Sequence, residues 1–332
     1  MNSLNKYREI FGKKLRPPYI IAEIGVNHEG NINKAKQLIS LAKEGGADAV
    51  KFQTYKADDL ASKNSPSYWD LSEEPTTSQH ELFSKYDKFN LDDYLVLSEY
   101  CESINIEFLS TPFSIDSVKL LKPLVKFFKV ASADITNLPL LRIIAKTNKP
   151  ILLSTGASNL NEIRQAVKVI KEFGNGEIII MHCILNYPTK HENSNLNMIE
   201  DISKNFPKAL VGYSDHTVPT EEMEICSTAY LKGAYVIEKH FTDDKDKKGN
   251  DHYHSMDKND LARLRNSLDR INLILGISEK KYLDSEIISR TNARRSIYTR
   301  IPIYKGETLT EKNLICKRPG TGLSPMKWDD VI

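Results

Sequence analysis

Eight short apolar runs, each as long as a β-strand, alternate along the chain with segments of helical periodicity. The runs are 18–25, 48–54, 106–113, 127–132, 151–155, 177–183, 210–216 and 235–241. Alternating strands and helices imply parallel pairing through right-handed crossovers, and continuously apolar strands are typical of a sheet buried on both faces. Eight units over about 250 residues match a closed barrel. We therefore predict an α/β fold, a (β/α)₈ TIM barrel. The rival is a doubly wound open sheet, but no Gly-rich dinucleotide motif follows the first run.

Two segments do not fit the repeating unit. Residues 55–90 are polar and aromatic and too long for an ordinary connection, so we expect them to fold over one mouth of the barrel. After the last helix, a polar connector leads into a tail of short strands and turn residues. We predict a barrel domain over 1–276, a linker over 277–292 and a small, mostly β domain over 293–332.

The composition excludes several classes of protein. Forty-six basic and 44 acidic side chains leave a formal charge of +2, too little for a field that would attract nucleic acid or an anionic membrane. No apolar run approaches the roughly 20 residues of a membrane span, and the first residues hold no apolar run of secretory length. The four cysteines form no CxxC pair, which indicates reduced, structural thiols. We predict a cytoplasmic protein with small-molecule ligands and neither a nucleic acid nor a membrane as partner.

Polar residues close each apolar run. Active sites of such barrels lie at the C-terminal ends of the strands, and burying many polar groups there costs stability unless ligands or neighbours satisfy them. These residues include Glu23, Lys51, Gln53, Thr111, Lys129, Ser132, Asp134, Ser154, His182, Tyr187, Ser214, His216, Glu238 and His240. The pattern indicates a binding site at this end of the barrel.

Two histidines close neighbouring runs. His216 and His240 would lie on the same rim, within reach of one divalent cation. With only two protein ligands the cation would keep open positions, which suits a Lewis acid that polarises a carbonyl. The alternative is two histidines that only form hydrogen bonds in loops. For His182, within an apolar run, a packed imidazole is at least as good an explanation as a ligand.

Two lysines and several hydroxyl groups converge without a Gly-rich loop. Lys51 and Lys129, with Ser132, Ser154 and Ser214, would suit a small substrate that carries both phosphate and carboxylate. A strand lysine could instead form a Schiff base, as in an aldolase that cleaves a keto sugar acid, or could extend to the rim in a structural role.

Three carboxylates are candidates for acid–base chemistry or for contacts with sugar hydroxyls. Glu23 and Asp134 end strands, and Asp251 lies in a charged loop after the last run, where a solvated surface role is the alternative. A non-enzymatic alternative is a sugar-binding or ice-binding C-terminal module on an inert barrel. The polar strand ends argue against an inert barrel.

Several motifs occur together and in order: IIAEIGVNHEG, GADAVKFQTYKA, FLSTPFS, FKVASADITNLPLL, ILLSTGAS, HCILNYPT, VGYSDHT, VIEKHFT, ARRSIY and KRPGTGLSP. With them the chain resembles the N-acetylneuraminate synthase (sialic acid synthase) family over essentially its whole length. The resemblance implies a TIM barrel followed by an antifreeze-like (SAF) domain. It also implies a transferase that condenses phosphoenolpyruvate with an N-acetylated amino sugar and releases phosphate, with Mn²⁺ or Mg²⁺ as cofactor.

The resemblance further implies a role for each matching residue. Glu23, Asp134, His216 and His240 would be catalytic, and the two histidines would hold the metal. The phosphoenolpyruvate would bind to Lys51, Thr111, Lys129, Ser132, Ser154 and Ser214. The sugar would contact Glu23, Gln53, Tyr187, Asp251 and Arg318. Arg318 would reach the N-acetyl group from the SAF domain of the other subunit in a domain-swapped homodimer.

The chain departs from the family pattern at the sugar side. Asp134 replaces a common glutamate, Leu185 and Asn186 alter one motif, and the loop reads GNDHYH where GPDH is commoner. These departures leave the acceptor open between N-acetylmannosamine and a diacetylated 6-deoxy sugar of the legionaminic or pseudaminic series. The chain stops at DDVI, short of the usual end of a SAF domain, so we expect that domain to be incomplete or naturally short.

Overall fold

The computed structural model describes residues 3–12, 17–249 and 251–332. The chain divides into two compact units, Met1–Leu273 and Ile274–Ile332, and each is described by itself. The first unit holds the predicted barrel, and the second holds the predicted small β module.

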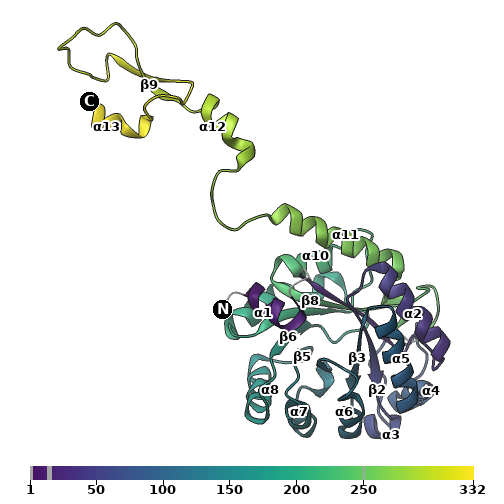
Figure 1. The fold of residues 1–332 in the computed structure, drawn as a ribbon. Helices are drawn as coiled ribbons and strands as arrows, with labels where there is room; N and C mark the ends of the chain where they lie inside the picture. The colour runs from purple at the N-terminus through teal and green to yellow at the C-terminus, as the bar shows by residue number, and fades with distance from the viewer. Residues whose placement is uncertain (1–2, 13–16, 250) are drawn as a thin grey trace. The chain divides into compact units, whose positions relative to one another are not determined.

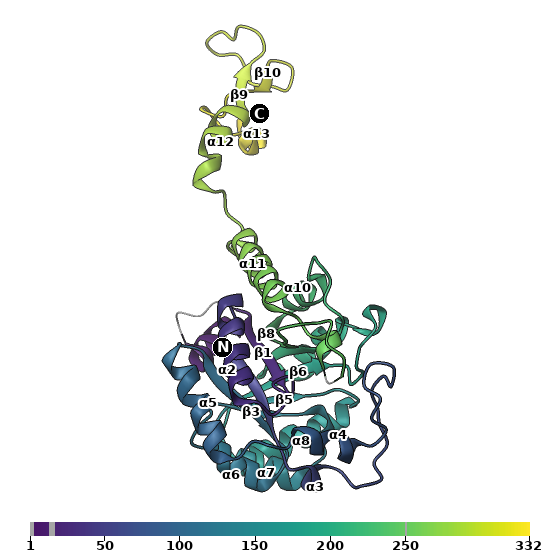
Figure 2. The ribbon, with the colours of Figure 1, turned by 90° about the vertical axis from the view of Figure 1, so that its right-hand side faces the viewer.

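Eight parallel strands form one curved sheet in the described part of the first unit (Figures 1 and 2). They are β1 (Tyr19–Gly25), β2 (Ala49–Thr54), β3 (Glu107–Pro112), β4 (Phe128–Val130), β5 (Ile151–Ser154), β6 (Ile178–Cys183), β7 (Leu210–Asp215) and β8 (Ala234–His240). Their order is β3-β2-β1-β8-β7-β6-β5-β4, and the end strands β3 and β4 contact each other, so the sheet nearly closes. The predicted TIM barrel is confirmed.

Helices cover the outside of the strands (Figure 1). They are α2 (Ile32–Gly45), α5 (Leu91–Ser103), α6 (Ile115–Leu121), α7 (Leu138–Ala145), α8 (Leu160–Phe173), α9 (Asn197–Asn205), α10 (Glu224–Leu231) and α11 (Lys258–Leu275). Helix α8 illustrates why the sequence folds this way. Asn159 and Glu162 form a capping box at its start, and the buried Ile163, Val167 and Ile170 recur at helical spacing on the side that packs on the sheet.

An N-terminal helix that the sequence analysis did not predict packs at the N-terminal end of the strands. Helix α1 (Ser3–Phe11) buries Tyr7 and Phe11. The ring of Phe11 stacks on Tyr19 with centroids 4.5 Å apart, and both rings meet Phe127 edge-on. Because Tyr19 begins β1 and Phe127 directly precedes β4, this aromatic cluster lies at the end of the barrel opposite to the C-terminal strand ends.

The long segment after β2 folds as predicted near the C-terminal strand ends. It contains the short helices α3 (Ala57–Leu60) and α4 (Gln79–Tyr86) and an isolated bridge between Pro66 and Ser78. The indole nitrogen of Trp69 donates to the carbonyl oxygen of Glu74 at 3.0 Å, which fixes the turn between them. Side chains of this segment, Tyr68 and Trp69 among them, line the cavity described below.

The second unit is small and contains an antiparallel pair of strands. Strands β9 (Ser296–Thr299) and β10 (Leu314–Lys317) pair so that Ser296 lies opposite Lys317. Helices α12 (Ile287–Ala293) and α13 (Trp328–Val331) and the short 3₁₀ turns η4 (Asp284–Glu286) and η5 (Pro325–Lys327) complete it. Helix α12 falls mostly within the stretch predicted as linker; the domain boundaries themselves stay predictions. All four cysteines are free, as expected.

Candidate active site

A cavity of about 470 Å³ opens at the C-terminal ends of the barrel strands. Its lining includes Glu23, Lys51, Gln53, Thr111, Lys129, Ser132, Asp134, Ser154, Tyr187, Ser214, His216, His240 and Asp251. The structure therefore brings these predicted residues together, whereas His182 is not among the lining residues. Their individual roles stay predictions. Arg318 is exposed and follows β10 in the second unit, and its predicted contact with the sugar also stays a prediction.

Lys51 lies in the middle of a buried polar network. Its ammonium group forms an ion pair with Glu23, donates a hydrogen bond to Thr111 Oγ1 at 2.9 Å and lies 3.8 Å from Glu238 Oε1. Gln53 Nε2 donates to the other oxygen of Glu23 at 3.0 Å. Burial opposes the charge on Lys51, but Glu23 and Glu238 outweigh it and raise the pKa of this ammonium group, which therefore stays protonated.

Glu238 connects the two lysines. Its Oε1 accepts from Lys129 at 2.8 Å and from Ser214 Oγ at 3.2 Å. Burial alone would raise the pKa of Glu238, but the charges of Lys129 and Lys51 lower it to about 2. Sequence reasoning noted Glu238 at a strand end but gave it no role, because its partners come from distant strands of the barrel.

The pKa of Glu23 is shifted in the opposite direction to that of Glu238. Burial raises the pKa of this carboxyl group above its usual value, although Lys51 partly offsets the effect. Two neighbouring carboxyl groups whose pKa values are pushed apart are typical of an acid–base pair with separate tasks. The two lysines thus hold Glu238 as an anion more strongly than Lys51 holds Glu23.

The hydroxyl groups of Ser132 and Ser154 also line the cavity. Ser132 Oγ accepts from the backbone nitrogen of Gly156 at 2.9 Å and also interacts with the thiol of Cys183. Ser154 Oγ is buried and has no hydrogen-bond partner within the described residues. A buried hydroxyl without a partner costs about 1–3 kcal/mol, which favours a ligand as its partner. Asp134 is half-buried beside them; burial raises its pKa, and Asn137 donates to it at 3.0 Å.

The two histidines predicted to hold a metal lie side by side. The ring centroids of His216 and His240 are 5.4 Å apart. His216 Nδ1 lies 2.8 Å from the carbonyl oxygen of Ile184, which can only accept, so Nδ1 carries the proton and Nε2 keeps its lone pair. His240 Nδ1 lies 3.2 Å from Asp251 Oδ2. Burial opposes protonation of His240, yet Asp251 and then Glu23 raise its pKa.

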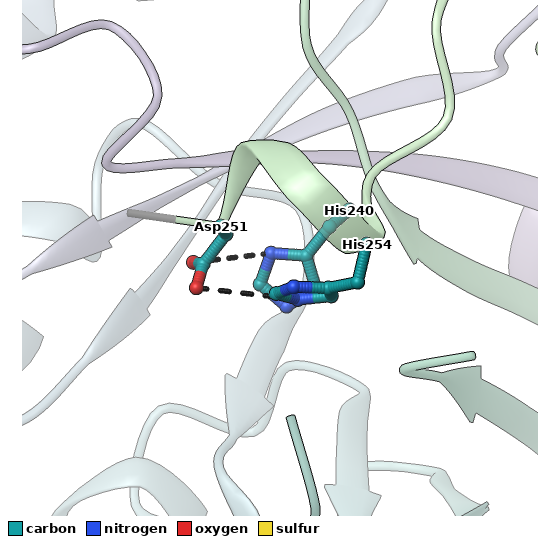
Figure 3. A group of neighbouring side chains, drawn as sticks. All are labelled: His240, Asp251 and His254. Carbon is teal, nitrogen blue, oxygen red and sulfur yellow. Dashed lines mark ion pairs between the residues drawn. The ribbon is translucent and has the colours of Figure 1, made fainter. Parts of the chain in front are cut away.

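A third imidazole, which sequence reasoning missed, lies beside His240 (Figure 3). His254 belongs to the 3₁₀ turn η3 (His252–His254), and its ring centroid is 4.8 Å from that of His240. One ligand atom from each of His240, Asp251 and His254 lies within 4.8 Å of the others. Burial, and after it His240, lower the pKa of His254 well below its usual value, so this ring is neutral. Imidazole nitrogens with a carboxylate are a donor set that fits a divalent transition metal.

Two candidate residues remain, His182 and Tyr187. His182 Nε2 meets the carbonyl oxygen of Ser194 at 2.8 Å and its ring stacks on Tyr213, so the packed imidazole is the correct alternative. The ring of Tyr187 lies 4.2 Å from that of His216, between the two sides of the cavity. Asn250 lies outside the described residues.

Known proteins are similar to this chain over most of its length. The model of the NeuB family matches residues 38–280 and that of the SAF domain matches 294–332. The N,N'-diacetyllegionaminic acid synthase of Legionella pneumophila is 40% identical over 95% of this chain and 89% of its own length. The pseudaminic acid synthase of Helicobacter pylori is 32% identical over 96% of this chain and 93% of its own length.

A solved structure is also similar to this chain. The N-acetylneuraminic acid synthetase of Leptospira borgpetersenii, in complex with citrate, superposes with a TM-score of 0.73 at 32% identity, covering 82% of this chain and 90% of its own. Within the described residues no helix is both long and apolar enough to cross a membrane. Synthase relatives at this similarity identify the chain as an enzyme. The protein belongs to the NeuB family and carries a C-terminal SAF domain.

Proposed function

We propose that this enzyme is a nonulosonic acid synthase that condenses phosphoenolpyruvate with an N-acetylated amino sugar, releases phosphate and requires a divalent cation. The observation that supports the proposal most is a single cavity in which two buried lysines with hydroxyl groups face a cluster of imidazoles. The first set suits an anionic donor substrate, and the second suits a carbonyl acceptor held by a cation.

Lys51 and Lys129 hold the anionic groups of phosphoenolpyruvate in this proposal. Both ammonium groups already contact Glu238, which keeps them positioned when no substrate is bound. Ser154, which lacks a partner among the described residues, and Ser132 would donate to the same substrate. Charges positioned before the substrate arrives stabilise the transition state without a cost of reorganisation.

The sugar aldehyde would lie toward the histidines. A divalent cation held by His216 and His240 would, when bound, polarise the aldehyde oxygen. The proton on Nδ1 of His216 leaves its Nε2 free for this task. C3 of phosphoenolpyruvate would then attack the aldehyde carbon, water would add to C2, and phosphate would leave with cleavage of its C–O bond. Glu23, whose pKa is raised by burial, is the group placed to exchange a proton during these steps.

The acceptor proposed first is a diacetylated 6-deoxy amino sugar. Two relatives that are 40% identical, from Legionella pneumophila and Campylobacter jejuni, are named N,N'-diacetyllegionaminic acid synthase. Aromatic and apolar side chains that line the cavity, Tyr68, Trp69 and Leu185, suit a methyl group and acetamido methyls better than hydroxyl groups.

A panel of sugars tests both the reaction and the acceptor. Purified enzyme is incubated with phosphoenolpyruvate, Mn²⁺ and one of three acceptors: N-acetylmannosamine or the diacetylated precursor of either legionaminic or pseudaminic acid. We expect phosphate release with a product whose mass is that of the condensed nonulosonic acid, and loss of both with a chelator. Absence of phosphate release with every acceptor would contradict the proposal.

The Schiff-base aldolase is the less favourable alternative. A lysine that attacks a carbonyl needs a lowered pKa, whereas the pKa of Lys51 is raised, and Lys129 is paired with Glu238 at 2.8 Å. Borohydride should therefore trap no covalent adduct with a keto sugar acid. The assembled cavity also argues against a non-catalytic sugar-binding protein.

Arg318 belongs to the proposal through the SAF domain. In a domain-swapped homodimer its guanidinium group would reach the N-acetyl group of a sugar bound in the barrel of the other subunit. The side chain is exposed, which leaves it available for such a contact.

A further inference from the structure

We propose that His254 is a third imidazole ligand of the divalent cation, so that the site comprises His216, His240 and His254 with Asp251 beside them. The inference rests on the proposed function, which requires a cation here, and goes beyond the two histidines implied by the family resemblance. It begins with the position of His254, whose ring lies 4.8 Å from that of His240 and 6.4 Å from that of His216.

The burial of His254 needs an explanation. Its side chain has no exposed surface, and neither ring nitrogen has a hydrogen-bond partner within the described residues. The nearest acceptor given for it, Asp251 Oδ1, is 4.0 Å away, too far for a hydrogen bond. A buried polar group without a partner costs about 1–3 kcal/mol. A bound cation would supply the missing partner of one of the two nitrogens.

The turn that carries His254 directs it at the site. Side chains three residues apart lie above one another in a 3₁₀ turn, so Asp251 at the start of η3 and His254 at its end share one face. Figure 3 shows both side chains converging on the ring of His240. Ligands of a single transition-metal ion lie at most about 4.2 Å apart. One ligand atom from each of His240, Asp251 and His254 lies within 4.8 Å of the others, so these three residues need only a small contraction.

The neighbouring His252 provides a matched comparison. It lies in the same turn and is equally buried, but its Nδ1 pairs with Thr242 Oγ1 at 2.7 Å and its Nε2 lies 3.4 Å from Glu29 Oε1. Its ring therefore has polar neighbours away from the cation site. A substitution at His252 changes the same turn without removing a proposed ligand.

A third nitrogen ligand changes the preferred metal. Imidazoles favour transition metals, whereas Mg²⁺ prefers oxygen ligands. We therefore expect Mn²⁺ and Co²⁺ to bind much more tightly than Mg²⁺, and replacement of His254 to reduce this difference.

The test measures metal binding by the full chain without substrates. Metal-free protein is titrated with Mn²⁺ and with Co²⁺ by calorimetry, for the unsubstituted chain, His254→Ala, His254→Leu and the control His252→Gln. His254→Leu keeps most of the buried volume, so it remains informative if the alanine variant fails to fold. We expect both His254 variants to weaken binding by at least about tenfold, since even an outer partner of a metal ligand contributes about 10- to 100-fold. His252→Gln should bind like the unsubstituted chain.

Pulsed electron paramagnetic resonance of bound Mn²⁺ counts the coordinated nitrogens directly. We expect one nitrogen coupling fewer in folded His254→Leu than in the unsubstituted chain. Equal affinity and equal couplings would overturn the inference while phosphate release by the unsubstituted enzyme still supported the synthase proposal. Conversely, His254-dependent metal binding without phosphate release from any sugar would reject the synthase proposal and leave the cation site in place.

Discussion

At the scale of single residues, the site depends on two carboxyl groups that flank one lysine. Glu23 and Glu238 both lie near Lys51, yet burial raises the pKa of Glu23 while Lys129 and Lys51 lower that of Glu238 despite its burial. The difference arises because Glu238 faces two ammonium groups and Glu23 pairs with one. The two carboxyl groups of this cavity therefore differ in how strongly the lysines stabilise their charged form.

Replacing Glu238 by glutamine should destabilise the barrel at neutral pH. The change leaves Lys129 without its buried counter-ion, and breaking such a pair costs about 3–5 kcal/mol. The folded-state pKa of Glu238 lies below its unfolded value, so its contribution is fully present above the unfolded pKa and declines as the pH falls toward about 2. Urea unfolding of the unsubstituted chain and of Glu238→Gln, at neutral pH and at about pH 3, measures the difference in their free energies of unfolding. This difference should be smaller at the acidic pH.

The control for this variant is Glu172→Gln on the exposed side of helix α8. It should unfold like the unsubstituted chain at both pH values. A Glu238→Gln protein with unchanged stability, or with the same deficit at both pH values, would show that Glu238 is not held as an anion by the lysines.

Removing His240 tests the cation side of the cavity. We expect His240→Ala to abolish metal-dependent phosphate release, because the imidazole lies in the middle of the cluster formed by His216, Asp251 and His254. Circular dichroism should match that of the unsubstituted enzyme. Full activity in a folded His240→Ala enzyme would exclude the proposed role of the cation.

At the scale of elements, the alternation of side chains along β7 and β8 separates function from stability. Ser214 pairs in register with Glu238 and both face the cavity, whereas the next pair, Asp215 and Lys239, forms a fully buried ion pair at 2.5 Å. Because successive side chains point to opposite faces of a strand, one short motif supplies both cavity-lining groups and a buried ion pair that stabilises the barrel.

Gly212 in β7 should not tolerate a larger residue. A Cβ at this position would lie 2.3 Å from Met181 Sδ and 2.9 Å from the carbonyl oxygen of Val236, so β6, β7 and β8 would have to shift. We expect Gly212→Ala to lower the free energy of unfolding by about 1–3 kcal/mol, as is usual for overpacking. Chemical denaturation measures it.

A second substitution identifies the cause. Adding Met181→Val to Gly212→Ala removes the contact with the sulfur but leaves that with the Val236 carbonyl, so only part of the stability should return. Full recovery would assign the whole effect to Met181, and an unchanged stability in Gly212→Ala alone would show that the strands accommodate the methyl group freely.

The elements were predictable from the sequence where local pattern determines them. The apolar runs predicted the eight strands. Because parallel strands of a barrel end at the same rim, the sequence also predicted that the residues from Glu23 to His240 at these ends line one cavity. His254 was missed because its direction depends on a 3₁₀ turn that no local signal marks. The role of Glu238 was missed because Lys129 and Lys51 reach it from β4 and β2, far away along the chain. Helix α1 was not predicted because aromatic side chains hold it in place through contacts with rings that lie elsewhere in the chain.

At the scale of the whole molecule, the enzyme consists of two units that contribute different residues to the proposed reaction. Every residue of the cavity lining belongs to Met1–Leu273, whereas Arg318 belongs to Ile274–Ile332. If the sugar must contact both the cavity and Arg318, each active site of the proposed domain-swapped homodimer contains residues of both subunits. Activity would then require the dimer. Arg318→Ala should then raise the Michaelis constant for the sugar much more than that for phosphoenolpyruvate, and the opposite order would contradict the assignment.

Mixing two defective enzymes distinguishes a swapped site from one built within a single chain. His240→Ala subunits keep Arg318, and Arg318→Ala subunits keep His240, so a swapped heterodimer contains one barrel with an intact cluster that receives an intact arginine. After subunit exchange between equal amounts, half of the dimers would be mixed, and each would have one complete site of two. Activity at a low sugar concentration should therefore rise to roughly a quarter of that of the unsubstituted enzyme. A site built within one chain predicts no gain over the average of the separate variants, because neither subunit then has both residues. Size-exclusion chromatography must show that the mixture is dimeric, and a dimer that exchanges subunits without regaining activity would reject the swap.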